Sequence, residues 1–147
     1  MDTELAGLLF NQTIEKYHRA LNELNKGNAH PVLDIFSGEE DVSLANPSGA
    51  TVMGRKNVVE AAERLGSDLR DGQSTGFESL TRFVSCDFAY VIENEHYKTK
   101  VGVKQDFSQI DLRATSIFRM ENGGWKMVHR HADPLIMERP AETMMQR

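Results

Sequence analysis

The chain of 147 residues has little cysteine, no excess of positive charge and no long apolar run, and each shortage excludes a class of protein. Its single cysteine, Cys86, excludes an internal disulfide and fits a reducing cytoplasm. A formal net charge of -5 argues against a nucleic-acid partner, because neutralising phosphates requires a basic surface. No apolar run approaches the roughly 18 residues of a membrane-spanning helix, so we expect no membrane partner.

What is present fits one globular domain in the cytoplasm. The length matches the ~100–150 residues that a single core occupies. The hydrophobic content of 39% and the charged content of 27% are those of an ordinary soluble protein. Asp2 and Glu4 stand where a signal peptide would carry positive charge, so we expect no secretion.

The first half of the chain has helical periodicity. Residues 3–26 are predicted to form a long amphipathic helix, which ends at Gly27 and Asn28. Its apolar stripe consists of Leu5, Leu8, Leu9, Ile14, Tyr17, Leu21 and Leu24. A short helix is predicted from Pro31 onward, and a third helix after Gly54.

The second half alternates with the period of strands. Strands are predicted at residues 77–84, 88–101, 110–120 and 125–133, and the Asn122-Gly123 pair is typical of a tight hairpin. A short strand at 42–45, followed by a turn, can pair with residues 51–53. The pattern predicts an α+β fold, a curved antiparallel sheet wrapped around the N-terminal helix with a pocket between them. We expect residues 1–134 to form the domain and residues 135–147 to be a mobile tail.

This order of elements resembles SnoaL-like domains of the nuclear transport factor 2 and ketosteroid isomerase superfamily, which have a cystatin-like cone fold. The resemblance rests on Gly54 before the third helix, Ala-Tyr-Val-Ile at 89–92, Leu-Arg-Ala-Thr at 112–115 and the ending Gly-Trp-Lys-Met-Val-His-Arg-His-Ala-Asp-Pro at 124–134. The ending also resembles the association domain of calcium/calmodulin-dependent kinase, with its Trp-x-x-Val-His-x-His run.

The resemblance implies a site whose familiar acids are replaced. Tyr17 matches the oxyanion-donor tyrosine of ketosteroid isomerases, but Asn46 stands where their aspartate base precedes a proline, and an amide has no useful basicity. Their second aspartate falls near Ser116, and the aspartate of related epoxide hydrolases falls near Arg130. Both activities are therefore disfavoured, and no catalytic residue is assigned.

Two sets of residues compete for the pocket. The first set consists of Tyr17, Asn46, Tyr90, Ser116 and Arg130. In the association-domain resemblance, arginines inside the cone bind small carboxylates and one corresponds to Ser116, which favours an inward Arg130 and a polar or anion-accepting pocket. The second set, which could line the pocket or a subunit interface, consists of Glu95, Arg113, Trp125, His129 and His131.

Strand alternation puts His129 and His131 on one face and Arg130 on the other. A three-residue turn at 121–123 would put Ser116 on one face with Val128 and Arg130, and Arg113 on the face of the histidines; a shift of one residue reverses this assignment. The non-catalytic interpretation of the second set is a buried polar network, Glu95–Arg113–His131, at a subunit interface. His-x-His alone is a thin metal signature, so we expect no metal and no cofactor.

Three functions stay open at this stage. The first is a small-molecule binding protein without turnover. The second is a lyase, isomerase or hydrolase that uses a histidine as acid or base and Tyr17 as donor. The third is an assembly module. We also expect a homodimer through the outer sheet face, because both faces of the 110–133 hairpin carry large apolar side chains, with Phe118 and Met120 on one face and Ile117, Trp125 and Met127 on the other.

Overall fold

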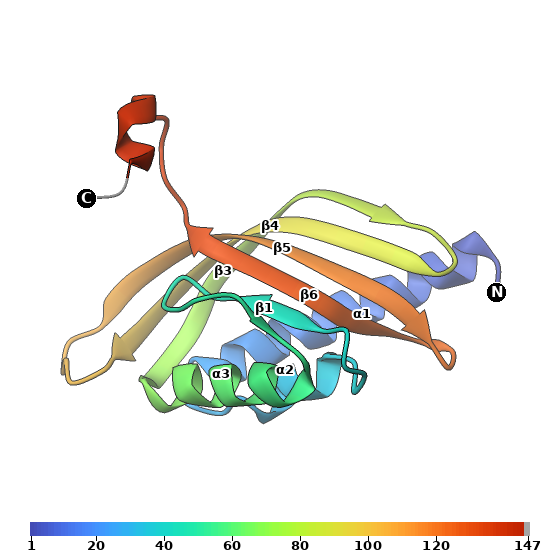
Figure 1. Ribbon diagram of the computed structural model, residues 1–147, viewed down its shortest axis with the longest axis horizontal. Coiled ribbons are helices and arrows are strands. Elements are labelled where there is room, and N and C mark those ends of the chain that lie inside the picture. Colours follow the sequence, from blue (N-terminus) through green and yellow to red (C-terminus); the bar gives the residue numbers. More distant parts are fainter. Residues whose placement is uncertain (146–147) are drawn as a thin grey trace.

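The computed structural model describes residues 1–145 as one curved sheet with three helices on one face (Figure 1). The helices are α1 (Thr3–Leu24), α2 (His30–Ile35) and α3 (Arg55–Ser67). The strands are β1 (Ser43–Ala45), β2 (Val52–Met53), β3 (Leu69–Val84), β4 (Phe88–Val101), β5 (Ser108–Glu121) and β6 (Gly124–Pro134). The predicted α+β class and the sheet around the N-terminal helix are confirmed. The sheet order is β2-β1-β6-β5-β4-β3, and all pairs are antiparallel except β1 with β6.

Helix α1 supplies the apolar side chains that lie against the concave face of the sheet. Asp2 caps its first turn by accepting a hydrogen bond from the Leu5 amide at 2.8 Å. The buried stripe begins at Ala6 and continues through Phe10, Ile14, Tyr17, Ala20, Leu21 and Leu24. The predicted stripe was wrong at its start, because Leu5 and Leu8 are 45% and 57% exposed.

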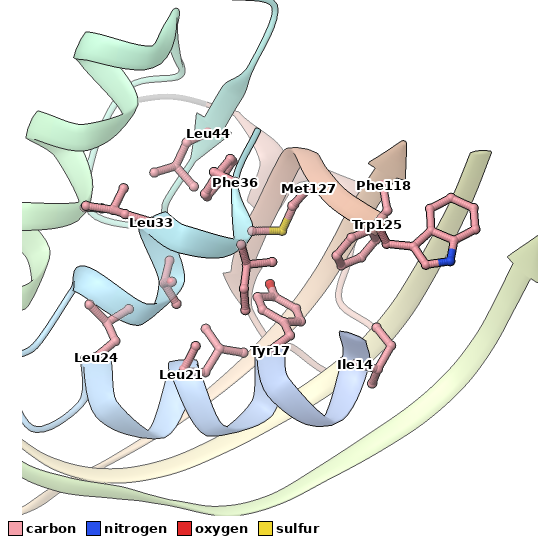
Figure 2. Close-up of a cluster of buried hydrophobic side chains, with 14 of the residues drawn as sticks. Ile14, Tyr17, Leu21, Leu24, Leu33, Phe36, Leu44, Phe118, Trp125 and Met127 are labelled. Carbon is pink, nitrogen blue, oxygen red and sulfur yellow. The ribbon is translucent and has the colours of Figure 1, made fainter. Parts of the chain in front are cut away.

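The core closes around aromatic side chains from α1, β5 and β6 (Figure 2). The ring of Phe10 meets those of Phe118 and Trp125 edge to face, with centroids 5.1 Å and 5.5 Å apart. The Trp125 indole donates a hydrogen bond to the Ala6 carbonyl at 3.0 Å, which satisfies its only polar group. This contact fixes the first half of α1 against the sheet.

Bulges bend the longest strand of the sheet. The β3–β4 pairing shifts register at three places, between Arg70 and Gln73, Ser74 and Gly76, and Ser79 and Thr81. Near the first bulge, Gly72 lies so close to Thr99 that a Cβ atom would come within 1.6 Å of the threonine hydroxyl. The Gly72 amide donates to the Asn25 carbonyl at 2.9 Å, so this glycine allows β3 to contact the end of α1.

The β5–β6 hairpin differs from the predicted register and still brings Arg130 inward. Glu121 pairs with Gly124, so the turn has two residues, Asn122 and Gly123, both with positive φ. This register pairs Trp125 with Met120 and Met127 with Phe118 on the inner face, so the prediction that Trp125 and Met127 lie on the other face from Phe118 and Met120 was wrong.

A bulge in β6 then returns Ser116 and Arg130 to the same face, as predicted. The register shifts between Ile117 and Phe118, where Val128 is the extra residue of β6. Beyond the bulge, Ser116 pairs with Arg130 and Thr115 pairs with His131. Arg130 and Ser116 are both buried on the inner face, whereas His131 is exposed on the outer face.

The C-terminal segment leaves β6 on the side away from the helices (Figure 1). Residues 135–140 carry no regular structure, and Ala141–Met144 form one exposed turn of 3-10 helix. The mobility of residues 135–147 stays a prediction, and its last two positions lie outside the described residues. None of the described helices combines the length and apolar character needed to cross a membrane.

Candidate functional site

A cavity of about 390 Å³ lies between the end of α1, the end of α3 and the concave face of the sheet. Its walls are mainly apolar, and they consist of Leu21, Leu24, Leu65, Leu69, Val101, Ile110 and Leu112 with Pro47 and Pro134. Tyr97, Arg130, Asn25 and Asn46 are the principal polar contributors. This volume and mixture are typical of small-molecule sites.

A buried ion pair lies at the polar part of the cavity wall. Arg130 of β6 contacts Glu95 of β4 through two parallel hydrogen bonds, from Nη1 to Oε2 at 2.6 Å and from Nη2 to Oε1 at 2.8 Å. Arg130 is 6% exposed and Glu95 is 0% exposed. A two-pronged guanidinium–carboxylate pair has the geometry that can offset the desolvation of both charges.

The pair shifts the ionisation of both partners. Burial alone would raise the pKa of Glu95, but the charge and hydrogen bonds of Arg130 outweigh burial and lower this pKa. Burial likewise opposes protonation of Arg130, and Glu95 outweighs it, so the pKa of Arg130 is raised. Both groups are therefore charged at neutral pH, and together they carry no net charge.

Three hydroxyl groups complete this network. Arg130 Nη1 donates to the Tyr17 oxygen at 2.5 Å, and the same oxygen lies 2.9 Å from Ser116 Oγ. Tyr97 donates to Glu95 Oε1 at 2.8 Å. Burial raises the pKa of Tyr17 to about 12, so its hydroxyl stays neutral. We refer to Tyr17, Glu95, Tyr97, Ser116 and Arg130 as the arginine network.

The arginine network uses three of the five N–H groups of Arg130, so the Nε–H and one Nη2–H are left without a partner among the described residues. Arg130 Nε makes no hydrogen bond with the described residues. Every buried side-chain nitrogen and oxygen in this part of the chain has a partner, so the unbonded Nε is reached from outside. Because Arg130 lines the cavity, its Nε–H is available to an acceptor bound there.

The first predicted set is only partly gathered at this site. Tyr17 and Ser116 are fully buried behind Arg130 and support it without lining the cavity. Asn46 lines the cavity next to Pro47, at the start of the β1–β2 loop. Tyr90 lies on the outer face of β4, where its ring stacks on Phe83 at 6.0 Å, so its predicted pocket position was wrong.

The second predicted set separates between the two faces. The proposed Glu95–Arg113–His131 network does not form, because Glu95 faces inward while Arg113 and His131 are exposed on the outer face. Trp125 belongs to the core and is not among the residues that line the cavity. Strand alternation gives this outcome, since Glu95 shares its face with Val91 and Tyr97.

The two histidines of β6 form outer-face contacts. His129 Nδ1 lies 2.7 Å from the Ser43 hydroxyl, and partial burial followed by the nearby His131 lowers the pKa of His129. His131 pairs with Asp133 at 3.1 Å. No histidine is among the cavity-lining residues in residues 1–145, so neither is placed for acid–base work on a ligand there.

Sequence reasoning missed Tyr97 as a pocket residue and Glu93 as a buried acid. The signal was present in β4, where Ala89, Val91, Glu93, Glu95 and Tyr97 occupy alternate positions and face the helix together. Among residues 1–145, no three His, Cys, Asp or Glu side chains lie close enough together to bind a metal ion.

Solved structures share this architecture at low sequence identity. A candidate dehydratase of the nuclear transport factor 2-like family from Streptomyces avermitilis has a TM-score of 0.73 and 17% identity, over 91% of this chain and 99% of that chain. A ketosteroid isomerase-like protein from Erwinia carotovora has a TM-score of 0.73 and 14% identity, over 88% and 96%. A candidate calcium/calmodulin-dependent kinase II association domain from Thiobacillus denitrificans has a TM-score of 0.67 and 19% identity, over 84% and 93%. At these identities the structures establish a shared fold.

Comparison with curated protein sequences gives no match. Comparison with family models gives a match: the model described as a SnoaL-like domain matches residues 10–137, which contain the whole arginine network. The chain belongs to the SnoaL-like family.

Proposed function

We propose that this protein binds a small, largely apolar molecule that carries a neutral hydrogen-bond acceptor such as a carbonyl oxygen. The observation that carries the proposal is the arginine network at one wall of an otherwise apolar cavity. The Nε–H of Arg130 offers a fixed donor to the acceptor, and the leucine-rich walls bury the rest of the molecule.

Charge balance favours a neutral ligand over an anion. Glu95 already neutralises Arg130, so a bound carboxylate would leave one uncompensated negative charge within a mainly apolar wall. This argument counts against the anion-accepting pocket expected from the sequence. A neutral acceptor gains the hydrogen bond without that penalty.

Binding without turnover is the form of the proposal that the geometry favours. Tyr17 is engaged with Arg130 and Ser116 and has no exposed surface. Asp111 also lines the cavity, but its carboxylate accepts hydrogen bonds from His96 at 2.6 Å and Gln109 at 3.2 Å. No cofactor enters the proposal.

We also propose a homodimer through the outer face of β4, β5 and β6. Tyr90, Ile92, Ile117 and Val128 lie there only partly buried, and a second copy would cover them. Arg113 is exposed on the same face, so Arg113→Glu should weaken the dimer through charge repulsion. Light scattering that gives a monomer mass at micromolar concentration contradicts this part of the proposal.

A cytoplasmic location remains our expectation, because the single Cys86 is compatible with a reducing compartment.

A thermal-shift screen with matched ligand pairs tests the proposed ligand class. Each pair shares one ring skeleton, drawn from steroids and polyketides, and differs only in a ketone or a carboxylate. We expect the ketone to raise the melting temperature more than the carboxylate, because at equal concentration the tighter ligand stabilises the folded state more. A consistent preference for the carboxylate, or no response to any member, contradicts the proposal.

A further inference from the structure

A second hollow adjoins the cavity beside Arg130. It has a volume of about 360 Å³ and lies between α3 and the hairpin of β1 and β2. This hairpin is at the edge of the sheet, next to α3 (Figure 1). Asn46, Ser48 and Leu65 line both spaces, so they form the boundary between them. The two spaces are therefore neighbours, and one ligand of sufficient length can occupy both.

Few contacts hold this boundary in place. Outside the strand ladders, residues 47–51 make one hydrogen bond with the rest of residues 1–145, from the Gly49 amide to the Asn46 carbonyl at 3.2 Å. That bond lies within the turn and does not join it to α3. On the other side of the boundary, Leu65 is only half-buried. An arm of a ligand can pass between the turn and Leu65 without breaking a hydrogen bond between the turn and the helix.

The floor of the second hollow is apolar. Leu44 is buried, and Val52 and Ala61 are half-buried. All three line this hollow, and none of them lines the cavity beside Arg130. A short hydrocarbon chain that extends from the cavity would leave water here and gain affinity from its burial.

The rim of the hollow carries a donor and an acceptor. Arg64 and Asp68 both line the hollow, and both are exposed. Neither forms an ion pair, with the other or with any further residue among residues 1–145. They are four positions apart at the end of α3, so they lie on the same side of the helix. A group that both accepts and donates hydrogen bonds can meet the two together.

The position of Asp68 does not serve the helix. Asp68 caps the C-terminus of α3, where the helix dipole is negative and a carboxylate is unfavourable. No cation among residues 1–145 is paired with it to offset this cost. The carboxylate is instead placed to accept a hydrogen bond from a group bound in the hollow.

We propose that the second hollow binds an arm of the ligand, a short hydrocarbon chain that ends in a neutral group which donates and accepts hydrogen bonds, such as a primary amide. The amide oxygen accepts from Arg64, and the amide N–H donates to Asp68. A neutral end suits this rim, because Arg64 and Asp68 carry opposite charges. The inference rests on the proposed function, since the ring system and its carbonyl stay beside Arg130.

Three ligands test the arm. They are the ketone that binds best in the screen, the same ketone with a saturated arm, and the ketone with an arm of equal length that ends in a primary amide. Calorimetric titration of the native chain gives the three dissociation constants. We expect the saturated arm to bind at least about threefold more tightly than the ketone alone, because its chain is buried. The amide arm should bind about tenfold more tightly than the saturated arm, because its hydrogen bonds have charged partners.

Arg64→Met and Asp68→Ala each remove one partner of the amide. Each should reduce the tenfold preference for the amide arm to about threefold or less. Lys56→Met and Glu60→Ala are the matched controls, since they make the same changes of charge at exposed positions of α3 that line neither space. Both controls should keep the preference.

Ala61→Phe fills the second hollow without touching the walls of the cavity. It should remove the gain from both arms and change the affinity for the ketone alone by less than about twofold. The second site is overturned, and the proposed function stands, if the ketone binds but the amide arm has no advantage, or if the gain from the arms persists in folded Ala61→Phe. Failure of the native chain to bind the ketone itself overturns both.

Discussion

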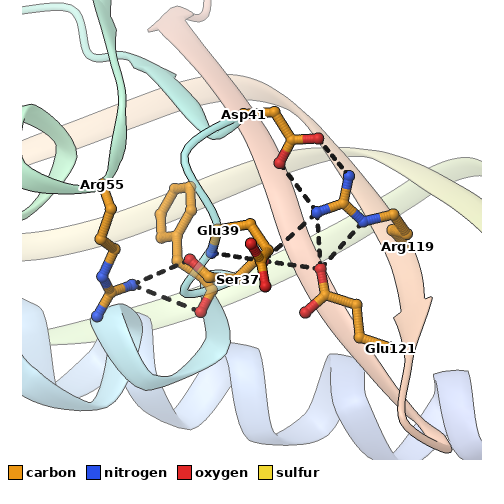
Figure 3. Close-up of polar contacts among 7 residues, drawn as sticks. Ser37, Glu39, Asp41, Arg55, Arg119 and Glu121 are labelled. Carbon is orange, nitrogen blue, oxygen red and sulfur yellow. Dashed lines mark hydrogen bonds and ion pairs between the residues drawn. The ribbon is translucent and has the colours of Figure 1, made fainter.

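Two arginines of neighbouring strands, Arg130 and Arg119, each donate to carboxylate and hydroxyl oxygens, but in opposite surroundings. Arg130 is enclosed with Glu95, and both side chains are almost inaccessible. Arg119 binds Asp41 through two hydrogen bonds of 2.6 Å and 3.0 Å and also contacts Glu121 (Figure 3). Its side chain is 34% exposed and that of Asp41 is 64% exposed.

The exposed arrangement holds a loop rather than a site. Glu121 accepts from the Ser37 hydroxyl at 2.7 Å, so Arg119 and Glu121 join the end of β5 to the segment before β1. Arg55 supports the same segment by donating to the carbonyls of Phe36 at 3.5 Å and Ser37 at 3.4 Å (Figure 3). Water competes for the exposed groups around Arg119, whereas burial shields the hydrogen bonds between Arg130 and Glu95 from water.

The number of contacts does not decide which of the two arginines contributes more to stability. Arg119 has more carboxylate partners, but solvent screens them. Arg130 has one carboxylate, and neither charge can be left alone in the protein interior. Burial decides which arginine matters for folding and which surface can recognise a ligand by its charge.

Arg130→Met should break the buried side of the comparison with the largest effect. It leaves Glu95 buried without a counter-charge, so we expect a loss of about 3–5 kcal/mol of unfolding free energy. The double variant Glu95→Gln with Arg130→Met should recover at least half, because glutamine is neutral and still offers Tyr97 an acceptor. Urea denaturation measures both. An Arg130→Met loss below about 1 kcal/mol would show that the pair is not buried as described.

Arg119→Met breaks the exposed side of the comparison. We expect a loss of stability several-fold smaller than for Arg130→Met, since the contacts of Arg119 are open to solvent. The remaining effect should fade in about 1 M salt, where screening is nearly complete. Urea denaturation at low and high salt gives the result. A loss equal to that of Arg130→Met, unchanged by salt, contradicts the distinction.

His96 sharpens the comparison with a partly exposed pair that titrates. Hydrogen bonds from His96 to Asp111 at 2.6 Å and Glu78 at 2.7 Å raise the pKa of His96 above its usual 6.5. A raised folded-state pKa stabilises the protein below the unfolded value and loses that effect as pH rises through the folded value. We therefore expect the stability difference between the native chain and His96→Gln to shrink with rising pH.

The size of the His96 effect should be the smallest of these, on the order of a few tenths of a kcal/mol. Thermal unfolding at about pH 6 and about pH 8.5 measures it, because these two values lie on either side of the usual histidine pKa of about 6.5. A difference that grows toward high pH would contradict the sign. The outer-face position of His96 makes the same profile informative about the proposed dimer.

Periodicity predicted most of the fold. The helical stripe of α1 and the alternation of β4, β5 and β6 depend on local sequence, and they gave the order, the class and the strand directions of the main hairpins. The inward position of Arg130 beside Ser116 was expected for an incorrect reason. The two-residue turn and the Val128 bulge each shift the register by one, and together they return Ser116 and Arg130 to the same face, as a three-residue turn would have done.

The partners in the site depended on distance in the sequence. Glu95 was predicted in a set that could line either the pocket or a subunit interface, and an acid is seldom buried unless a cation meets it. That cation is Arg130, which lies 35 positions away and is brought near by the intervening strand β5. The contact between His18 and Glu93 spans 75 positions and gave no local signal. Pairings of this kind appear only once the sheet order is known.

The ligand preference of Glu95→Gln tests most directly the claim that Glu95 sets the charge of the cavity. Glutamine keeps one acceptor oxygen, which Tyr97 and Arg130 can share, and it removes the counter-charge of Arg130. With the best ketone and carboxylate pair from the screen, we expect the native chain to prefer the ketone and Glu95→Gln to prefer the carboxylate by about tenfold, since the guanidinium then needs an anion. An unchanged ketone preference in folded Glu95→Gln, measured by calorimetric titration, would contradict the account.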